Sequence, residues 1–214
     1  MKKDLSHVNL GDTLLFGRYP READGTVRPL VWKTIGLDEE QNRILVLCRD
    51  IIDMHCYHEE NRPVSWEKSE LRNWLITDFV NAAFDADEQE NLMDSFDAGK
   101  LEFYDLMWDC EERIYQYTPV IMDPVFLLHP EDLFALFPYD QEKRCFAGSG
   151  AKMTPYVMAR YRNMPEHCRD NWWLRATRRW EPHACFQARW GKICCTEIAK
   201  DSLCGVRPAM WLRR

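Results

Sequence analysis

Two tryptophans stand side by side in Trp172-Trp173-Leu174-Arg175, and this feature limits most strongly what the chain can fold into. Each tryptophan buries about 150–250 Å² when packed, so an adjacent pair is costly to leave in water. The pair predicts an interior segment in which at least one ring is almost fully buried. Near the end of the chain, Gly205 precedes a β-branched residue, and an arginine then precedes a rigid proline. This pattern predicts a final strand, Val206–Leu212, in which Arg207 is held by a fixed partner.

The apolar content sets the size of the core. Hydrophobic residues make up 46% of the 214 residues, and nine residues are tryptophan. A chain of this length and composition can build one cooperative core and does not match a disordered protein. No linker rich in glycine, serine or proline divides it. We therefore expect a single domain over residues 1–214, with residues 94–120 as an insertion packed on its body.

The charge of the chain is acidic overall but unevenly distributed. The formal net charge is −7, from 35 acidic and 28 basic residues. A chain this acidic is not expected to bind nucleic acid through its overall field. Between residues 160 and 189, however, seven arginines face only three carboxylates. This excess predicts one locally cationic face on an acidic body.

The cysteines indicate a reducing compartment. There are nine, an odd number at irregular spacing, which argues against the disulfide framework of a secreted protein. The N-terminal residues lead into no apolar signal core, and no run approaches the ~20 apolar residues of a membrane span. We expect a cytoplasmic protein with reduced cysteines and no membrane association. The oligomeric state stays open.

The hydrophobic patterns mix strands and helices and predict the α+β class. A helix is expected over Trp66–Phe79, and a second one after Asp85, where Asp85 and Glu88 form a capping pair. Pro130 suits the first turn of a third, Glu131–Phe137. We expect the first and last strands to pair or lie adjacent in one sheet, with the 66–79 helix packed against it. The expected strands are 12–19, 30–37, 43–48 and 123–129, a hairpin over 183–198, and the closing strand.

Short motifs run in order through most of the chain. They include Phe16-Gly17-Arg18-Tyr19, Pro29-Leu30-Val31-Trp32, Leu71-Arg72-Asn73-Trp74-Leu75, Val125-Phe126-Leu127-Leu128, Trp172-Trp173-Leu174-Arg175 and Gly205-Val206-Arg207-Pro208-Ala209. Together they resemble a bacterial family of domains of unknown function with a C-type-lectin-like fold. That resemblance implies a small twisted, mostly antiparallel sheet with flanking helices. The closing motif is distantly similar to formylglycine-generating, sulfatase-modifying domains and to variable proteins diversified by retroelements.

Three segments carry residues that could bind metal, but each has a simpler interpretation. Cys194 and Cys195 would point to opposite faces of a strand, so buried structural thiols are expected rather than a metal or copper site. The loop from His55 to Glu60 is expected to be a polar surface loop, with a metal or catalytic site as the alternative. Trp180-Glu181-Pro182-His183 is similar to the sugar-and-calcium motif of true lectins, but histidine replaces the asparagine ligand. We predict no metal and no cofactor.

The leading functional hypothesis is a non-enzymatic binding domain. Arginine and tryptophan are enriched at binding hot spots, and both are concentrated in residues 177–193. The expected partner is a protein with surface carboxylates or another anionic ligand. An alternative places Trp180 and Trp190 in the core, and another makes the chain an enzyme related to the sulfatase modifiers. The predicted ligand-binding residues are Arg178, Arg179, Trp180, His183, Arg189 and Trp190.

Overall fold

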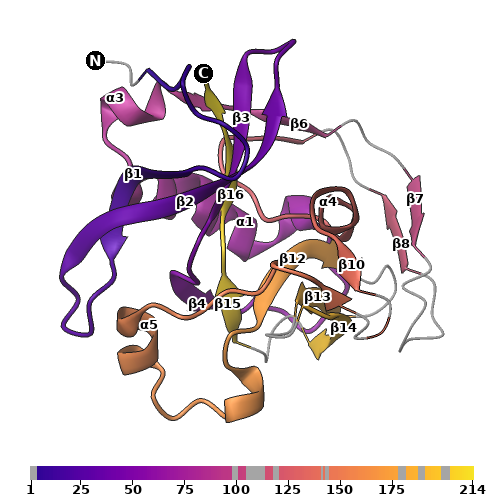
Figure 1. Ribbon diagram of the computed structural model, residues 1–214. Coiled ribbons are helices and arrows are strands. Elements are labelled where there is room, and N and C mark those ends of the chain that lie inside the picture. The colour runs from indigo at the N-terminus through magenta and orange to yellow at the C-terminus, as the bar shows by residue number, and fades with distance from the viewer. Residues whose placement is uncertain are drawn as a thin grey trace.

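The computed structural model has an α+β fold in which two five-stranded sheets share the core with short helices (Figure 1). It describes residues 4–97, 101–104, 114–117, 121–140, 142, 145–177, 182–187, 191–198 and 203–214. In this part of the chain, no helix is long and apolar enough to cross a membrane.

The first sheet is antiparallel and curled, and its strands come from both ends of the chain. Its order is β1-β2-β3-β16-β5. The strands are β1 (Thr13–Pro20), β2 (Val27–Asp38), β3 (Arg43–Cys48), β16 (Ala209–Arg213) and β5 (Leu92–Met93). The first and last strands therefore share one sheet, as expected, but they are not adjacent, because β2 and β3 lie between them.

The second sheet is mixed and has the order β14-β13-β12-β15-β4. β12 pairs in parallel with β15, whereas the other pairings are antiparallel. The predicted 183–198 hairpin is confirmed as β13 and β14. The strands are β4 (Asp53–His55), β12 (Trp172–Thr177), β13 (His183–Gln187), β14 (Ile193–Ile198) and β15 (Cys204–Val206). Separate two-stranded pairs are β6 (Ser95–Asp97) with β9 (Ile121–Asp123), β7 (Leu101–Tyr104) with β8 (Ile114–Tyr117), and β10 (Tyr139–Asp140) with β11 (Cys145–Phe146).

The three predicted helical segments are confirmed, whereas Pro155–Arg160 and Glu166–Cys168 are helical where the sequence predicted only strands and loops. Asp85 and Glu88 form the predicted capping box, and Pro130 occupies the first turn of its helix behind the N-cap His129. The 66–79 segment is helical and packs on the first sheet, where the Phe79 ring meets Tyr19 edge-on at 5.4 Å. The elements are η1 (Trp66–Lys68), α1 (Glu70–Trp74), η2 (Leu75–Phe79), α2 (Val80–Ala83), α3 (Ala86–Gln89), α4 (Pro130–Leu136), α5 (Pro155–Arg160) and η3 (Glu166–Cys168).

Two predicted strands are wrong in their extent. Val206–Leu212 is split into β15 and β16, which belong to different sheets. Between them, the buried Arg207 side chain donates to the carbonyls of Cys48 and Ser149 at 2.7 and 2.6 Å, and Pro208 has no N–H for a ladder. The fixed arginine is therefore confirmed, but it marks a crossing between sheets. With the described residues, the 123–129 segment forms one isolated bridge beyond β9, from Phe126 to Ala209.

The tryptophan pair lies at the centre of the core, as predicted. Trp172 and Trp173 are both 0% exposed, and all six residues of β12 are buried. A strand buried on both faces explains why its sequence does not alternate between apolar and polar residues. A single cluster of buried side chains extends from Leu5 to Leu212 and joins both sheets.

Candidate functional site

Half-buried aromatic side chains from separate elements meet around the short edge strand β4. Tyr19 comes from β1, Trp74 from the end of α1, and Tyr161 follows α5. Figure 1 shows α5 beside β4, and the Tyr161 hydroxyl donates to the carbonyl of Met54 at 3.3 Å. We call this group the Asp53 site and define it as Tyr19, Asp53, His55, Trp74, Arg160 and Tyr161.

Asp53 is the polar centre of the site. Only 8% of the residue is exposed. One carboxylate oxygen accepts a hydrogen bond from the Tyr19 hydroxyl at 2.9 Å, and the other accepts from the Met54 backbone N–H at 2.8 Å. Neither donor is a cation. Among the described residues, the ion-pair contact of Asp53 is with the imidazole of His55.

His55 lies between the carboxylate and the aromatic rings. Its Nε2 atom is 3.9 Å from the Asp53 carboxylate, which is too long for a hydrogen bond. The imidazole stacks on Trp74 with 4.0 Å between ring centroids. Its backbone carbonyl accepts a 2.8 Å hydrogen bond from the indole of the buried Trp173. The core tryptophan pair therefore helps to position this edge of the site.

Arg160 is the exposed cation of the site. Its guanidinium donates to the Tyr156 hydroxyl at 2.9 Å and lies about 6 Å from the Tyr156 and Tyr161 rings. Arg160 is exposed and makes no ion pair with Asp53 in the described part of the chain. Both charges nevertheless influence Tyr19, His55 and Tyr161. The site therefore holds two opposite charges that are near one another but not paired.

Burial controls the protonation of the site. It lowers the pKa of His55, an effect that the Asp53 carboxylate partly offsets. Burial, reinforced by the same carboxylate, raises the pKa of Tyr19 and of Tyr161. At neutral pH both tyrosines are hydrogen-bond donors, and His55 is a neutral imidazole that donates from one nitrogen and accepts at the other.

The lowered pKa of His55 predicts a loss of stability in mild acid. The unfolded chain takes up a proton near the ordinary pKa of 6.5, before the folded protein does, so unfolding becomes easier as pH falls through that value. We expect His55→Gln to reduce the difference in unfolding free energy between about pH 7.5 and about pH 5, measured by urea denaturation. His7→Gln, at an exposed histidine, is the control. Equal pH dependence in parent and His55→Gln would contradict the assignment.

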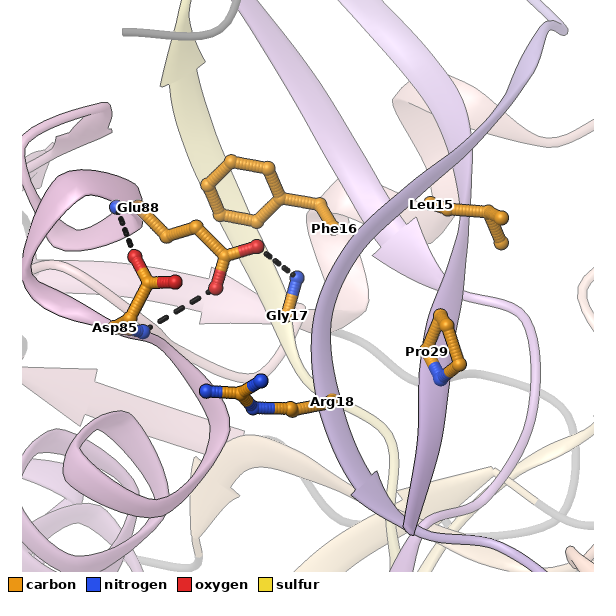
Figure 2. Close-up of a pocket in the computed structure, with 7 residues that line it drawn as sticks. All are labelled: Leu15, Phe16, Gly17, Arg18, Pro29, Asp85 and Glu88. Atoms are coloured by element: carbon orange, nitrogen blue, oxygen red, sulfur yellow. Dashed lines mark hydrogen bonds between the residues drawn. The ribbon is translucent and has the colours of Figure 1, made fainter. Parts of the chain in front are cut away.

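A separate hollow lies against β1, between this strand and α3 (Figure 2). Its volume is about 260 Å³. The Glu88 carboxylate in its wall accepts from the backbone N–H of Gly17 at 2.9 Å and from that of Asp85 at 3.2 Å. Asp85 in turn accepts from the Glu88 backbone N–H. These carboxylates cap α3 and join it to β1, so their oxygens are already engaged within the protein.

The predicted C-terminal surface falls largely outside the described residues. Five of the six predicted residues are outside the described part: Arg178, Arg179, Trp180, Arg189 and Trp190. The sixth, His183, is the first residue of β13. The strands that flank these segments are described: Thr177 is paired with Ala184, and Trp172 with Gln187. Residues 178–181 therefore follow the end of β12 at Thr177, and residues 188–190 follow the end of β13 at Gln187.

The predicted polar surface loop at 55–60 is wrong for its central residues. Tyr57 and His58 are 0% and 1% exposed, and His58 Nδ1 contacts the Glu70 carboxylate. The Tyr57 ring packs edge-on against Trp173 at 5.5 Å, so the loop enters the core. Its first residue, His55, belongs to the Asp53 site. No group of three His, Cys, Asp or Glu side chains in the described ranges could hold a metal ion.

The described cysteines include buried thiols. Cys48 is 1% exposed, and burial raises the pKa of its thiol to about 12. Burial also raises the pKa of Cys56. Neither these two nor Cys145 forms a disulfide with another described residue. Cys195 lies in β14, but its side chain is outside the described part of the structure.

Sequence reasoning did not identify Tyr19, Asp53, Trp74, Arg160 or Tyr161 as a site. One local signal was present: Thr154-Pro155 is an N-cap followed by proline, the pattern that also begins α4, and it predicts α5. The α5 spacing then places Tyr156 and Arg160 on one face. Their approach to Asp53 depends on long-range contacts that no local pattern predicts, such as the bridge from Ile51 to Met153 and the hydrogen bond from the Thr154 N–H to the Ile51 carbonyl.

Comparison with known proteins gives a family but no described activity. No curated protein and no solved structure matches this chain. A family described as a domain of unknown function, DUF6273, matches residues 41–214, which include β4, α1, α5 and both tryptophans of β12. The chain therefore belongs to the DUF6273 family.

Proposed function

We propose that this chain is a ligand-binding domain whose ligand binds at the Asp53 site. One observation carries the proposal: half-buried rings from β1, α1 and the end of α5 contact the buried Asp53 carboxylate or the next two residues of β4. Binding sites for small ligands typically combine apolar and aromatic walls with a few positioned polar groups. Trp74 and Tyr161 supply ring surface here, and Asp53, His55 and Arg160 supply hydrogen-bonding groups of different kinds.

Binding is favoured over the alternative of an enzyme related to sulfatase modifiers. A nucleophile is usually activated by a lowered pKa or by an adjacent base. Burial instead raises the pKa of Tyr19, Tyr161 and Cys56. His55 stacks on Trp74 and lies beyond hydrogen-bond distance of Asp53. These features suit recognition better than turnover.

A screen of small polar molecules tests the proposal. The library contains amines, carboxylates, polyols and saccharides, and binding is measured by NMR titration of the labelled protein. Ligands are expected to shift the amide signals of Met54, His55 and Tyr161. Trp74→Ala should weaken binding by about tenfold, because stacking on an aromatic ring contributes about 0.5–1.5 kcal/mol beyond its buried area.

The matched control for this screen is Trp211→Ala. Trp211 is also a half-buried tryptophan, but it lies in β16 of the other sheet, under the Arg43 guanidinium. Its removal should change affinity by less than about twofold. Ligands that bind Trp74→Ala as tightly as the parent would contradict the proposed site.

We propose the C-terminal surface as a second candidate, for a protein or anionic partner. The described end of the β13–β14 connection supports it: the Gly191 carbonyl accepts from the Phe146 N–H at 2.9 Å. Phe146 packs edge-on against Phe134, which is 52% exposed. An exposed aromatic group therefore lies beside this end of the hairpin.

A partner isolated by pull-down should bind less to Arg178→Ala, Trp180→Ala or Arg189→Ala, and unchanged binding of all three would reject this surface.

The C-type-lectin-like fold is also part of the proposal. Its support is that β1 and β16, from opposite ends of the chain, share one curled antiparallel sheet with helices packed against it. An experimental structure compared with lectin-like domains would test it, and a different strand order would reject it.

A further inference from the structure

We propose that the Asp53 site binds a primary ammonium group. This inference rests on the proposed ligand-binding function and names the chemical class of the ligand. It begins from Asp53, whose side chain is 11% exposed and which has no lysine or arginine partner among the described residues. Buried carboxylates are normally paired with a cation or bound to a metal. No lysine or arginine of the described residues supplies that cation to Asp53.

Contacts with the described residues use only part of the hydrogen-bonding capacity of Asp53. A carboxylate has about four acceptor positions, and the Tyr19 hydroxyl and the Met54 N–H occupy one on each oxygen. The unused positions are suited to N–H or O–H donors. An ammonium group has three donors and a full positive charge, whereas a hydroxyl has one donor and no charge. Its charge adds the Coulomb attraction that a neutral donor lacks.

His55 offers a second acceptor for the same ligand group. A neutral imidazole has one acceptor nitrogen, and His55 Nε2 lies 3.9 Å from the Asp53 carboxylate. In the tautomer with Nε2 unprotonated, an ammonium nitrogen about 2.9 Å from each of these atoms donates to both. The Tyr161 ring already lies 5.9 Å from the Arg160 guanidinium, so the aromatic surface of this site accommodates a cation.

The other charges near the site do not remove its preference for a cationic ligand. Arg160 and Asp78 are both exposed, and they act on His55 in opposite directions. Arg160 is also engaged by the Tyr156 hydroxyl. Exposed charges are screened by solvent and salt, whereas a buried carboxylate is screened much less. Asp53 therefore remains the dominant charge that a bound ligand meets.

The test compares three four-carbon probes of matched shape: n-butylammonium, n-butanol and n-butyrate. NMR titration of the parent protein should show saturable shifts at Met54, His55 and Tyr161 with n-butylammonium. Its affinity should exceed that of the other two by about tenfold or more. Glycine amide and Nα-acetyl-lysine amide then distinguish an α-amino group from a lysine side chain as the source of the ammonium.

Two outcomes overturn the inference in different ways. Preferential binding of n-butanol or n-butyrate at the same residues would reject the ammonium group but retain the proposed binding site. No shift with these probes or with any member of the screening library would reject both. Asp53→Asn is expected to reduce n-butylammonium binding by about tenfold or more. Glu22→Gln, at an exposed carboxylate paired with Arg28, should not change it.

Discussion

Replacing Trp173 with alanine is expected to destabilise the protein by about 3–5 kcal/mol. The indole is 0% exposed and packs edge-on against Tyr57 with 5.5 Å between ring centroids. Its N–H also donates to the carbonyl of His55 at 2.8 Å. Alanine therefore leaves a large cavity and removes a hydrogen bond to the backbone of the Asp53 site. The melting temperature should fall by roughly 6–20 °C, measured by calorimetry.

Trp173→Phe separates these two contributions. Phenylalanine keeps much of the buried ring but cannot donate to His55, so the expected cost is about 1–2 kcal/mol, well below that of alanine. Loss of this hydrogen bond should also weaken ligand binding at the Asp53 site, because it releases the backbone that carries His55. A Trp173→Ala protein that melts within about two degrees of the parent would show that the strand contributes little to the core.

Local patterns predicted those elements whose signals lie within a few residues. The capping box of Asp85 and Glu88 and the proline-led start of α4 were confirmed because each depends on neighbouring side chains. The strands β1, β2 and β3 were also confirmed close to their predicted bounds. The adjacent tryptophans predicted burial correctly, since no exposed arrangement accommodates so much aromatic surface.

Long-range organisation could not be predicted in the same way. Apart from Arg207 the closing segment is apolar, so its division between two sheets depends on that arginine and on carbonyls contributed by Cys48 and Ser149. The polar residues at 55–60 suggested a surface loop, yet the buried contact of His58 with Glu70 and the packing of Tyr57 on Trp173 bring it inside. These partners are distant in sequence or fall outside any periodic pattern.

The Asp53 site was missed for the same reason. β4 contains three residues, too few to show alternation, and it is recognisable only through its pairing with β15. In the sequence, the excess of arginine between residues 160 and 189 predicted a binding surface there instead. The Asp53 site depends on a buried carboxylate that has no lysine or arginine partner among the described residues. Composition does not reveal whether a particular carboxylate is buried.

Gly17→Ala is expected to destabilise the protein by roughly 2–5 kcal/mol, for two additive reasons. Gly17 has a φ of +68°, a conformation that costs an L-residue about 1–2 kcal/mol. An added Cβ would also lie 2.5 Å from the Phe84 ring and 2.9 Å from the Ala83 carbonyl. Phe84 is buried, and its ring packs against Phe16 and Phe79, so it has little room to move.

The position of Gly17 in the sheet adds to this effect. The pairing of β1 with β2 shifts register between Leu15 and Arg18, so Gly17 lies at a bulge. The bulge presents the Gly17 N–H to Glu88, the residue that also completes the α3 capping box (Figure 2). Any displacement that relieves the clash with Phe84 therefore disturbs the connection between the first sheet and α3.

Gly25→Ala is the matched control. Gly25 also has a positive φ, +83°, but an added Cβ there would meet no atom within 4 Å. It should therefore cost only the conformational term of about 1–2 kcal/mol. Urea denaturation gives the loss of unfolding free energy in each variant. The difference between the two losses is the cost of placing a Cβ against Phe84. If the two substitutions cost the same, that approach does not constrain the fold, and conformational freedom alone explains the glycine at position 17.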